Sequence, residues 1–213
     1  MKISPFIIVQ NSFCWIFILT LNICYSVEVT PTNRILVLGD SISAGFGLTQ
    51  GKGWVFLLQD TLKTSNYSFE VNNASISGET TAGGRQRVKK LVDLYKPNIL
   101  ILELGANDAL RGLSIKSSSQ NLEEIILHAK KSRIKVLLVG MRVPSNYGEE
   151  YTKEFNQLFL GIAKKEFTSF VPFLLEGFAT KGEFFQEDGI HPNEQAQIIM
   201  LKNVMPQLKI LLQ

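Results

Sequence analysis

The sequence predicts an α/β fold in which helices cover both faces of a parallel sheet. Short and almost continuous apolar runs alternate along the chain with segments of helical periodicity, which is the pattern of a buried parallel sheet. Of the 213 residues, 45% are hydrophobic and 19% are charged, as in an ordinary globular protein. No internal repeat and no linker-like stretch divides residues 27–213. We therefore expect this part of the chain to form one domain.

Two strands and two helices are expected in the first half of the chain. Residues 34–38, Arg-Ile-Leu-Val-Leu, form an apolar run that ends in a glycine, which indicates a buried strand. Apolar residues with helical spacing predict a helix around 55–62, and a weaker strand follows at 69–71. Apolar residues at positions i, i+3, i+4 and i+7 predict a second helix over 88–95, which ends before the Lys-Pro pair at 96–97.

The second half of the chain repeats this alternation. Residues 99–104 are a third apolar run, and helical spacing over 122–129 precedes a fourth strand at 136–139. Another helix is expected over 155–162, and a short fifth strand at 170–171. The order of elements is the one that a parallel sheet with helical crossovers requires.

The last helix is expected to begin after Asn193. Asparagine is a favoured N-cap residue, and Glu194 follows in the first turn, where the helix dipole favours an acid. Pro206 is expected to end or kink this helix, because proline has no N–H group to donate within it.

Residues 1–26 have the layout of a secretory signal peptide. Lys2 is the only charge before an apolar core over 13–21, and small residues stand three and one positions before a cut after Ser26. The alternatives are a retained membrane anchor, which needs about 20 mostly apolar residues, and a lipoprotein cut before Cys24. Cleavage after Ser26 removes both cysteines of the sequence. The mature protein is then periplasmic or secreted, has no stable membrane anchor and depends on its core for stability.

The charge balance argues against a nucleic-acid-binding protein. The sequence has 22 Lys and Arg residues against 19 Asp and Glu residues, which gives a formal net charge of +3. The basic residues form no stripe along the chain, so we expect no nucleic-acid partner.

Polar and small residues follow the predicted strands at the points where the strands end. Gly39-Asp40-Ser41 follows the first strand, residues 73–78 the second, Gly105-Ala106-Asn107-Asp108 the third, and Asp188-Gly189-Ile190-His191-Pro192 comes after the fifth. Ligands of parallel sheets bind at the carboxyl ends of the strands. A hydroxyl, a flexible glycine, an amide and a carboxylate–imidazole pair are therefore expected to meet at one edge of the sheet.

Ser41 is a candidate nucleophile, and a serine hydroxyl needs a neighbouring base to take its proton. The sequence has two histidines. His128 lies within a predicted amphipathic helix, away from any strand end, and is expected to be a partly exposed surface residue. His191 lies in a turn three residues after Asp188, where a carboxylate can bond one ring nitrogen while the other faces the serine. Each of these short patterns is weak alone, because Asp and Ser are common in turns.

An oxyanion formed by serine attack needs hydrogen-bond donors. The backbone N–H groups of Ser41 and Gly78 and the side-chain amide of Asn107 are the candidates. Gly78 has no Cβ, so its backbone can approach a reacting carbonyl closely. The alternatives are a simple turn glycine at position 78 and an Asx-turn residue at 107; the order of the motifs after successive strands favours the functional reading.

Four sequence blocks together resemble those of the SGNH (GDSL-type) hydrolase superfamily. They are Gly39-Asp40-Ser41-Ile42, the isolated Gly78, Gly105-x-Asn107-Asp108 and Asp188-x-x-His191-Pro192. The chain is most similar to the bacterial periplasmic thioesterase I / protease I / lysophospholipase group, over essentially all of residues 33–207.

The resemblance implies a fold and an activity. It implies Ser41 as nucleophile, His191 as base, Asp188 as the residue that orients it, and an oxyanion hole formed by Ser41, Gly78 and Asn107. The implied fold is a flavodoxin-like three-layer α/β/α sandwich with a five-stranded parallel sheet. The implied function is an exported serine esterase and thioesterase that acts on small acyl esters, thioesters or lysophospholipids, with neither a metal nor an organic cofactor. We also expect the protein to be a monomer.

The chain departs from the family pattern at two positions. Ile42 replaces the usual leucine after the serine, which is a nearly isosteric exchange. Ala106 stands where close relatives carry glycine before the asparagine. If that position requires a positive φ, alanine would strain the turn and misplace Asn107.

Two other functions remain as alternatives. A non-catalytic, nucleotide- or phosphate-binding flavodoxin-like module would hold the phosphate with residues 39–47, but Asp40 would repel it. A carbohydrate acetyl esterase would share the fold and differ in substrate. Leu110 and Leu113, just after Asn107, instead offer apolar side chains for an acyl chain; their alternative role is ordinary packing of a loop on the core.

Overall fold

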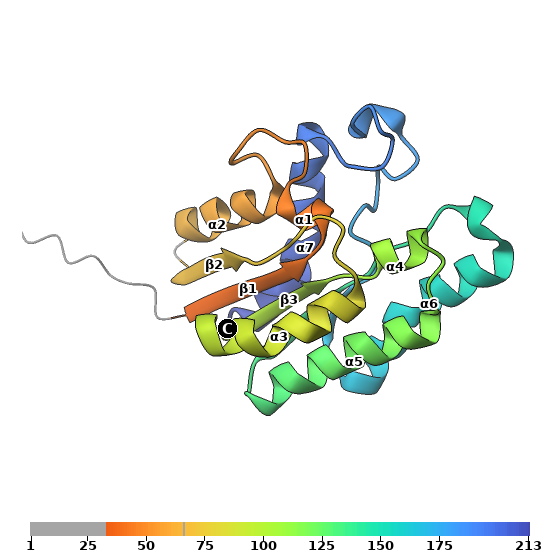
Figure 1. Cartoon of the computed structure of the whole chain (residues 1–213). Coiled ribbons are helices and arrows are strands. Elements are labelled where there is room, and N and C mark those ends of the chain that lie inside the picture. The colour runs from red at the N-terminus through yellow and green to blue at the C-terminus, as the bar shows by residue number, and fades with distance from the viewer. Residues whose placement is uncertain (1–32, 66) are drawn as a thin grey trace, which may run out of the picture. The chain divides into compact units, whose positions relative to one another are not determined.

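The computed structural model of the chain describes residues 33–65 and 67–213; the predicted signal peptide lies outside them. Five strands form one parallel sheet in the order β2-β1-β3-β4-β5 (Figure 1). Their bounds are β1 Asn33–Gly39, β2 Phe69–Asn73, β3 Ile99–Glu103, β4 Lys135–Val139 and β5 Ser169–Val171. The predicted five-stranded parallel sheet is confirmed, and its order is the flavodoxin-like one.

Helices cover both faces of this sheet (Figure 1). On one face α2 (Trp54–Thr64) packs against α7 (Glu194–Leu211). On the other face α5 (Ile115–Lys131) packs between α3 (Thr81–Tyr95) and α6 (Glu149–Glu166). Right-handed crossovers explain this division, because the chain moves from β1 towards one edge of the sheet and from β2 onwards towards the other.

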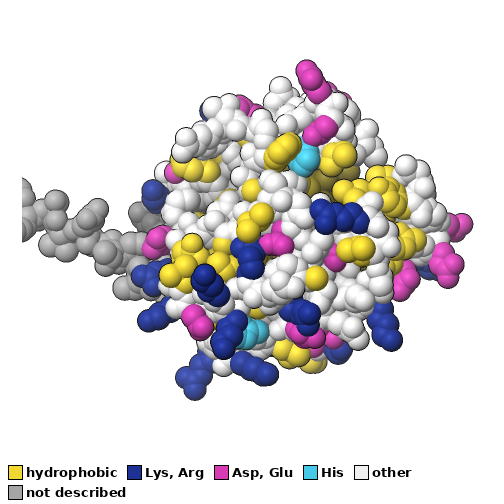
Figure 2. All heavy atoms as spheres, viewed as in Figure 1, with side chains coloured by type: hydrophobic (Ala, Val, Ile, Leu, Met, Phe, Trp, Pro, Cys, Tyr) yellow, Lys and Arg dark blue, Asp and Glu magenta, His cyan; other side chains and the backbone are white. Residues whose placement is uncertain are grey.

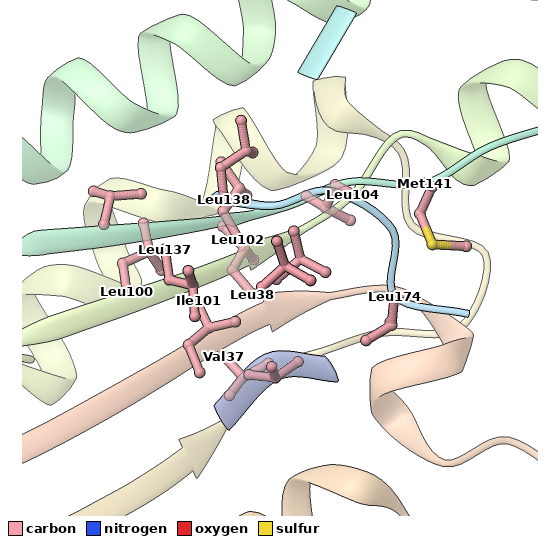
Figure 3. Packing of buried hydrophobic residues seen from close by; sticks show 14 of the residues in the cluster. Val37, Leu38, Leu100, Ile101, Leu102, Leu104, Leu137, Leu138, Met141 and Leu174 are labelled. Atoms are coloured by element: carbon pink, nitrogen blue, oxygen red, sulfur yellow. The ribbon is translucent and has the colours of Figure 1, made fainter. Parts of the chain in front are cut away.

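The core lies on both sides of the central strands. Figure 3 shows side chains of β1, β3 and β4 packed together, with Met141 and Leu174 beside them. All five residues of β3 are buried. Both faces of a central parallel strand are covered by helices, which is why the sequence of β3 is a continuous apolar run apart from Glu103.

The strands β1 and β3 end at the same level. Gly39 is paired with Glu103 in the register, so Ser41 and Gly105 follow at the same edge. The short helices α1 (Ser41–Ala44) and α4 (Ala106–Leu110) begin there. The chain leaves β1 and β3 in opposite directions along the sheet, and such a switch point is where doubly wound folds bind their ligands.

The structure differs from the sequence predictions in two places. Pro206 was expected to end or kink the last helix; it does not end α7, which continues to Leu211. Proline removes the hydrogen bond to the carbonyl four residues earlier and crowds that carbonyl, but the burial of Leu208 holds the last turn against the core. Residues 106–110, for which the sequence predicted no helix, form helix α4. Two short 3-10 helices, Ser145–Tyr147 and Gly182–Phe184, complete the connections.

No helix within residues 33–65 and 67–213 is both long enough and apolar enough to cross a bilayer.

Candidate active site

Ser41 lies at the first position of α1, directly after β1. Asp40 caps this helix: its Oδ1 accepts a hydrogen bond of 3.0 Å from the backbone N–H of Ile42. The side chain of Ser41 is at the carboxyl edge of the sheet, and the residue is 8% exposed. The N–H groups of a helix's first turn have no partner within the helix, so the backbone around Ser41 also presents donors to this edge.

His191 and Asp188 meet Ser41 in a hydrogen-bonded row. The distance from His191 Nε2 to Ser41 Oγ is 2.9 Å, and the distance from His191 Nδ1 to Asp188 Oδ2 is 2.6 Å. In the tautomer that satisfies both contacts, Nδ1–H donates to the carboxylate and Nε2 accepts from the hydroxyl. The arrangement therefore allows His191 to take the hydroxyl proton of Ser41.

Asp188 is held as a carboxylate. Its Oδ1 accepts from the backbone N–H groups of His191, at 2.9 Å, and of Ile190, at 2.8 Å. The backbone and side-chain hydrogen bonds of His191 lower the pKa of Asp188 to about 2. The charge opposite the imidazole is therefore present throughout the neutral range.

Gly78 is brought to the same edge by the loop between β2 and α3. The N–H of Ile76 donates to the carbonyl of Gly39 over 3.1 Å, which holds this loop against the end of β1. Gly78 itself has φ +78°, a left-handed conformation that favours glycine. The guanidinium of Arg111 donates to its carbonyl oxygen at 3.0 Å.

Asn107 is the second residue of α4 and is partly buried. Its side-chain Nδ2 donates to Asp40 Oδ2 at 3.0 Å. The amide is thus fixed by the residue next to Ser41, with one N–H engaged and the other available to a ligand.

The strain considered for Ala106 is absent. The left-handed conformation falls one residue earlier, on Gly105, which has φ +121°. Ala106 begins the helix α4 and is not among the residues with positive φ in the described part of the chain. A Cβ on Gly105 would also come within 3.2 Å of the Phe159 ring. Glycine is therefore required at 105, and alanine fits at 106.

Two carboxyl groups lie behind Ser41, and the sequence patterns assigned no role to either. Burial raises the pKa of Asp40 to about 6, against the opposing effect of its hydrogen bonds from Ile42 and Asn107. Glu103 is fully buried; burial raises its pKa well above the ordinary value, and the charge of Asp40 raises it further. Glu103 Oε2 accepts a 2.6 Å hydrogen bond from Ser43 Oγ. Burial thus favours the protonated, uncharged form of Glu103 over the carboxylate.

Asp108 links the two loops that carry the candidate oxyanion donors. It is buried, and its Oδ2 accepts from the backbone N–H of Thr81 at 2.9 Å. Its Oδ1 accepts from the hydroxyls of Thr81, at 2.5 Å, and Ser118, at 3.0 Å. The turn that contains Gly78 and the helix that contains Asn107 are thereby tied together.

Leu110 and Leu113 lie beyond Asn107, at the end of α4 and in the turn after it. They are 39% and 43% exposed, so neither is simply packed into the core. The hydroxyl of Tyr151 donates to the carbonyl of Leu113 at 3.2 Å and holds the turn towards α6. Figure 2 shows hydrophobic side chains gathered over the region around α4.

The remaining predicted positions lie elsewhere. His128 is half-buried on α5, in its last turn, and the hydrogen-bonded row at Ser41 does not include it. No three His, Cys, Asp or Glu side chains within residues 33–65 and 67–213 are arranged to hold a metal ion.

The sequence patterns assigned no role in the site to three residues that lie close to it. Glu103 interrupts an apolar strand, Asp108 follows the candidate asparagine, and Phe46 stands among the glycines after Ser41. The charge inside a buried strand is the signal that could have identified Glu103, because ionisable groups are rarely buried without a partner.

The sequence is similar to known proteins over most of its length. The profile of the GDSL-like lipase/acylhydrolase family matches residues 37–197. The chain is 46% identical to esterase TesA of Pseudomonas aeruginosa over 185 residues, which cover 87% of this chain and 92% of that protein. It is 39% identical to an arylesterase of Vibrio mimicus, covering 84% and 90%, and 34% identical to thioesterase 1/protease 1/lysophospholipase L1 of Escherichia coli, covering 88% and 89%.

Solved structures agree with these sequence matches. A crystal structure of TesA superposes with a TM-score of 0.82 at 45% identity and covers 84% of this chain and 99% of that one. The fold, the family profile and the curated relatives all point to the same activity. The chain therefore belongs to the GDSL-like lipase/acylhydrolase family and is an enzyme that hydrolyses ester bonds.

Proposed function

We propose that the protein is an exported serine hydrolase that cleaves acyl esters and thioesters through Ser41, His191 and Asp188. The observation that carries this proposal is the hydrogen-bonded row from Ser41 Oγ through His191 to Asp188, with contacts of 2.9 and 2.6 Å. These are the distances that nucleophile, base and orienting acid need for proton transfer.

In the acylation step, Ser41 Oγ attacks the carbonyl carbon while its proton moves to His191 Nε2. The carbonyl oxygen becomes an oxyanion, which the N–H groups of Ser41 and Gly78 and the amide of Asn107 stabilise. His191 then gives its proton to the leaving oxygen or sulfur as the bond to the carbonyl carbon breaks. Asp188 stabilises the imidazolium that exists between the two transfers.

Deacylation repeats these steps with water as the nucleophile. His191 takes a proton from water, the hydroxide attacks the acyl-serine, and Ser41 leaves with the proton from His191. Each step uses groups of the chain and water, so the mechanism calls for neither a metal nor an organic cofactor.

The substrates proposed are esters and thioesters with medium or long acyl chains, lysophospholipids included. Leu110 and Leu113 support this choice, because they are exposed apolar side chains directly after the proposed oxyanion residue. The names of the relatives, which include an arylesterase and a thioesterase/lysophospholipase, point in the same direction. A rate profile that peaks at acetyl esters would favour a carbohydrate acetyl esterase instead.

The location of the enzyme is part of the proposal. Residues 1–26 are proposed to direct export and to be removed, which leaves residues 27–213 as a single-domain, monomeric enzyme in the periplasm or outside the cell. The charged start and short apolar core of that segment support this assignment. N-terminal sequencing of the protein recovered from the cell envelope would locate the cut.

The nucleophile is tested by Ser41→Ala. The hydroxyl is the only group removed, so we expect turnover to be lost while the circular dichroism spectrum and melting temperature stay close to those of the unmodified enzyme. A fluorophosphonate should label the unmodified enzyme on Ser41, as mapped by mass spectrometry. Normal turnover by the alanine variant, or a label on another residue, would contradict the proposal.

A further inference from the structure

Phe46 is an aromatic residue that lies exposed against the proposed base. Its ring centroid is 4.6 Å from that of His191, with 40° between the ring planes, and the residue is 50% exposed. The backbone N–H of Phe46 bonds to Ser41 and its ring packs on His191, so Phe46 lies beside both proposed reacting residues. A large apolar side chain left open to solvent beside reacting groups offers a surface for a ligand.

The backbone of Phe46 is held from two sides. Its N–H donates to the carbonyl of Ser41 at 3.0 Å. Its carbonyl accepts from the side-chain amide of Gln186 at 2.8 Å, and the same amide donates to the carbonyl of Pro192 at 3.2 Å. The ring is therefore carried by a backbone fixed to both the serine turn and the histidine loop, so it forms a preorganised surface.

The chemistry decides which part of a substrate reaches this ring. The leaving oxygen or sulfur must come within hydrogen-bond distance of His191 Nε2, because that nitrogen returns the proton. The first atoms beyond the leaving atom then lie beside the imidazole, where the ring of Phe46 is an exposed aromatic neighbour. The acyl chain departs from the carbonyl carbon, and its proposed contacts, Leu110 and Leu113, belong to a different segment.

We propose that Phe46 forms a leaving-group site, which favours esters and thioesters whose alcohol or thiol part carries an aromatic group close to the scissile bond. This inference rests on the proposed roles of Ser41 and His191. An aromatic ring packs on phenylalanine in an offset or edge-on manner and gains more than its buried area alone. We expect this contact to raise kcat/KM by about 3- to 10-fold over a non-aromatic group of similar size.

The test varies the leaving group while the acyl group stays butyryl. The substrates are benzyl, cyclohexylmethyl and ethyl butyrate, and kcat/KM is measured because it includes the acylation step in which the leaving group departs. Phe46→Ala should lower kcat/KM for benzyl butyrate by about 3- to 10-fold, with a smaller loss for the cyclohexylmethyl ester and little change for ethyl butyrate. Phe46→Leu, which keeps apolar volume, should lose the benzyl preference over cyclohexylmethyl.

The controls separate this site from a purely structural role and from the proposed function. Phe167 is 91% exposed at the end of α6, and Phe167→Ala should leave all three rates unchanged. Equal losses for all three esters would show that Phe46 only supports His191, which overturns the inference. Ser41-dependent hydrolysis of ethyl butyrate by the unmodified enzyme tests the proposed function separately, so the two failures are distinguishable.

A second measurement follows the reverse step, in which an added alcohol enters the proposed leaving-group site and attacks the acyl-enzyme. By microscopic reversibility, an alcohol that attacks the acyl-serine binds where the leaving group departs. It gives its proton to His191, forms a new ester with the acyl group, and Ser41 recovers its hydroxyl. Added benzyl alcohol should therefore divert the acyl-enzyme to benzyl ester more efficiently than ethanol does in the unmodified enzyme. If Phe46→Ala retains that difference, Phe46 is not the site.

Discussion

Asp40 joins two parts of the site that the sequence patterns treat separately. One oxygen of its carboxylate caps the helix that starts with Ser41, and the other accepts from the side chain of Asn107. The same residue thereby positions the backbone at Ser41 and the amide of the proposed oxyanion hole. An acidic residue before the serine is needed here as a hydrogen-bond acceptor, and no step of the proposed mechanism uses it as a base.

Asn107→Ala tests whether the side-chain amide of this residue stabilises the oxyanion. The variant removes one oxyanion donor, so we expect kcat to fall about 100- to 1,000-fold with KM nearly unchanged. Fluorophosphonate labelling of Ser41 should continue at a lower rate. Asn156→Ala, at an exposed position of α6, is the control and should retain full activity. A loss below about threefold would mean that another donor fills this role.

The sequence predicted the positions of Ser41, Asp188 and His191 at one edge of the sheet, because each lies in a strand-end or pre-helix turn. It could not predict that the pKa of Glu103 is raised or that Asp108 ties two loops together. Both properties come from burial and from partners distant in sequence, such as Ser43 for Glu103 and Thr81 for Asp108. Local residue patterns hold no information on such contacts.

The helix α4 is an element that the sequence did not predict. Its five residues are too few for a periodic pattern, so the sequence indicated only a loop. The structure adds that Gly105 takes the left-handed conformation before the helix and that Asn107 points back to Asp40. The end of α4 then carries Leu110 out to the surface beside the site.

The role proposed for this element is tested by the double variant Leu110→Ser and Leu113→Ser. Each buried methylene contributes about 0.8 kcal/mol, so four further carbons could contribute roughly 3 kcal/mol before ordering costs. We expect kcat/KM of the unmodified enzyme to rise from acetyl to medium-chain p-nitrophenyl esters, by at most about 100-fold. The variant should flatten this rise and keep acetyl ester hydrolysis.

Serine at Leu127 and Leu160 provides the matched control, because these leucines on α5 and α6 are 43% and 44% exposed. This control should leave the chain-length profile unchanged. An identical profile in both double variants would show that Leu110 and Leu113 do not contact the acyl chain.

At the scale of the whole molecule, the sequence predicted the five strands and their covering helices because a doubly covered parallel sheet has a strong pattern. Each buried strand is an apolar run, and each helix has one apolar stripe. The helix α7 was the exception, since the helix end considered at Pro206 does not occur and packing carries the helix on to Leu211. The strand order depends on contacts between distant segments, and the family resemblance supplied it where periodicity could not.

Glu103 connects this core to the site. It is the last residue of β3, pairs in register with Gly39, and accepts from Ser43 in the helix that begins with Ser41. Its second carboxyl oxygen, Oε1, is buried without a hydrogen-bond partner in the described part of the chain. An ionised carboxylate is costly in such a place, and the protonated acid is the form that the fold stabilises.

The raised pKa of Glu103 predicts a pH-dependent stability that Glu103→Gln should remove. The unfolded chain loses this proton near pH 4.5, whereas the folded protein keeps it to higher pH. Folding therefore binds a proton above pH 4.5, so the contribution of Glu103 is fully present below that pH and is lost as the pH rises through the folded pKa. Glutamine is neutral at every pH and of nearly the same shape. The free energy of unfolding is measured by urea denaturation between pH 5 and 8. Relative to the unmodified enzyme, the free energy of unfolding of the variant should rise by up to about 1.4 kcal/mol per pH unit. Glu150→Gln, at an exposed position of α6, is the control for a general charge effect. If the free energy of unfolding depends on pH in the same way in the Glu103→Gln variant and the unmodified enzyme, Glu103 is ionised in the folded protein.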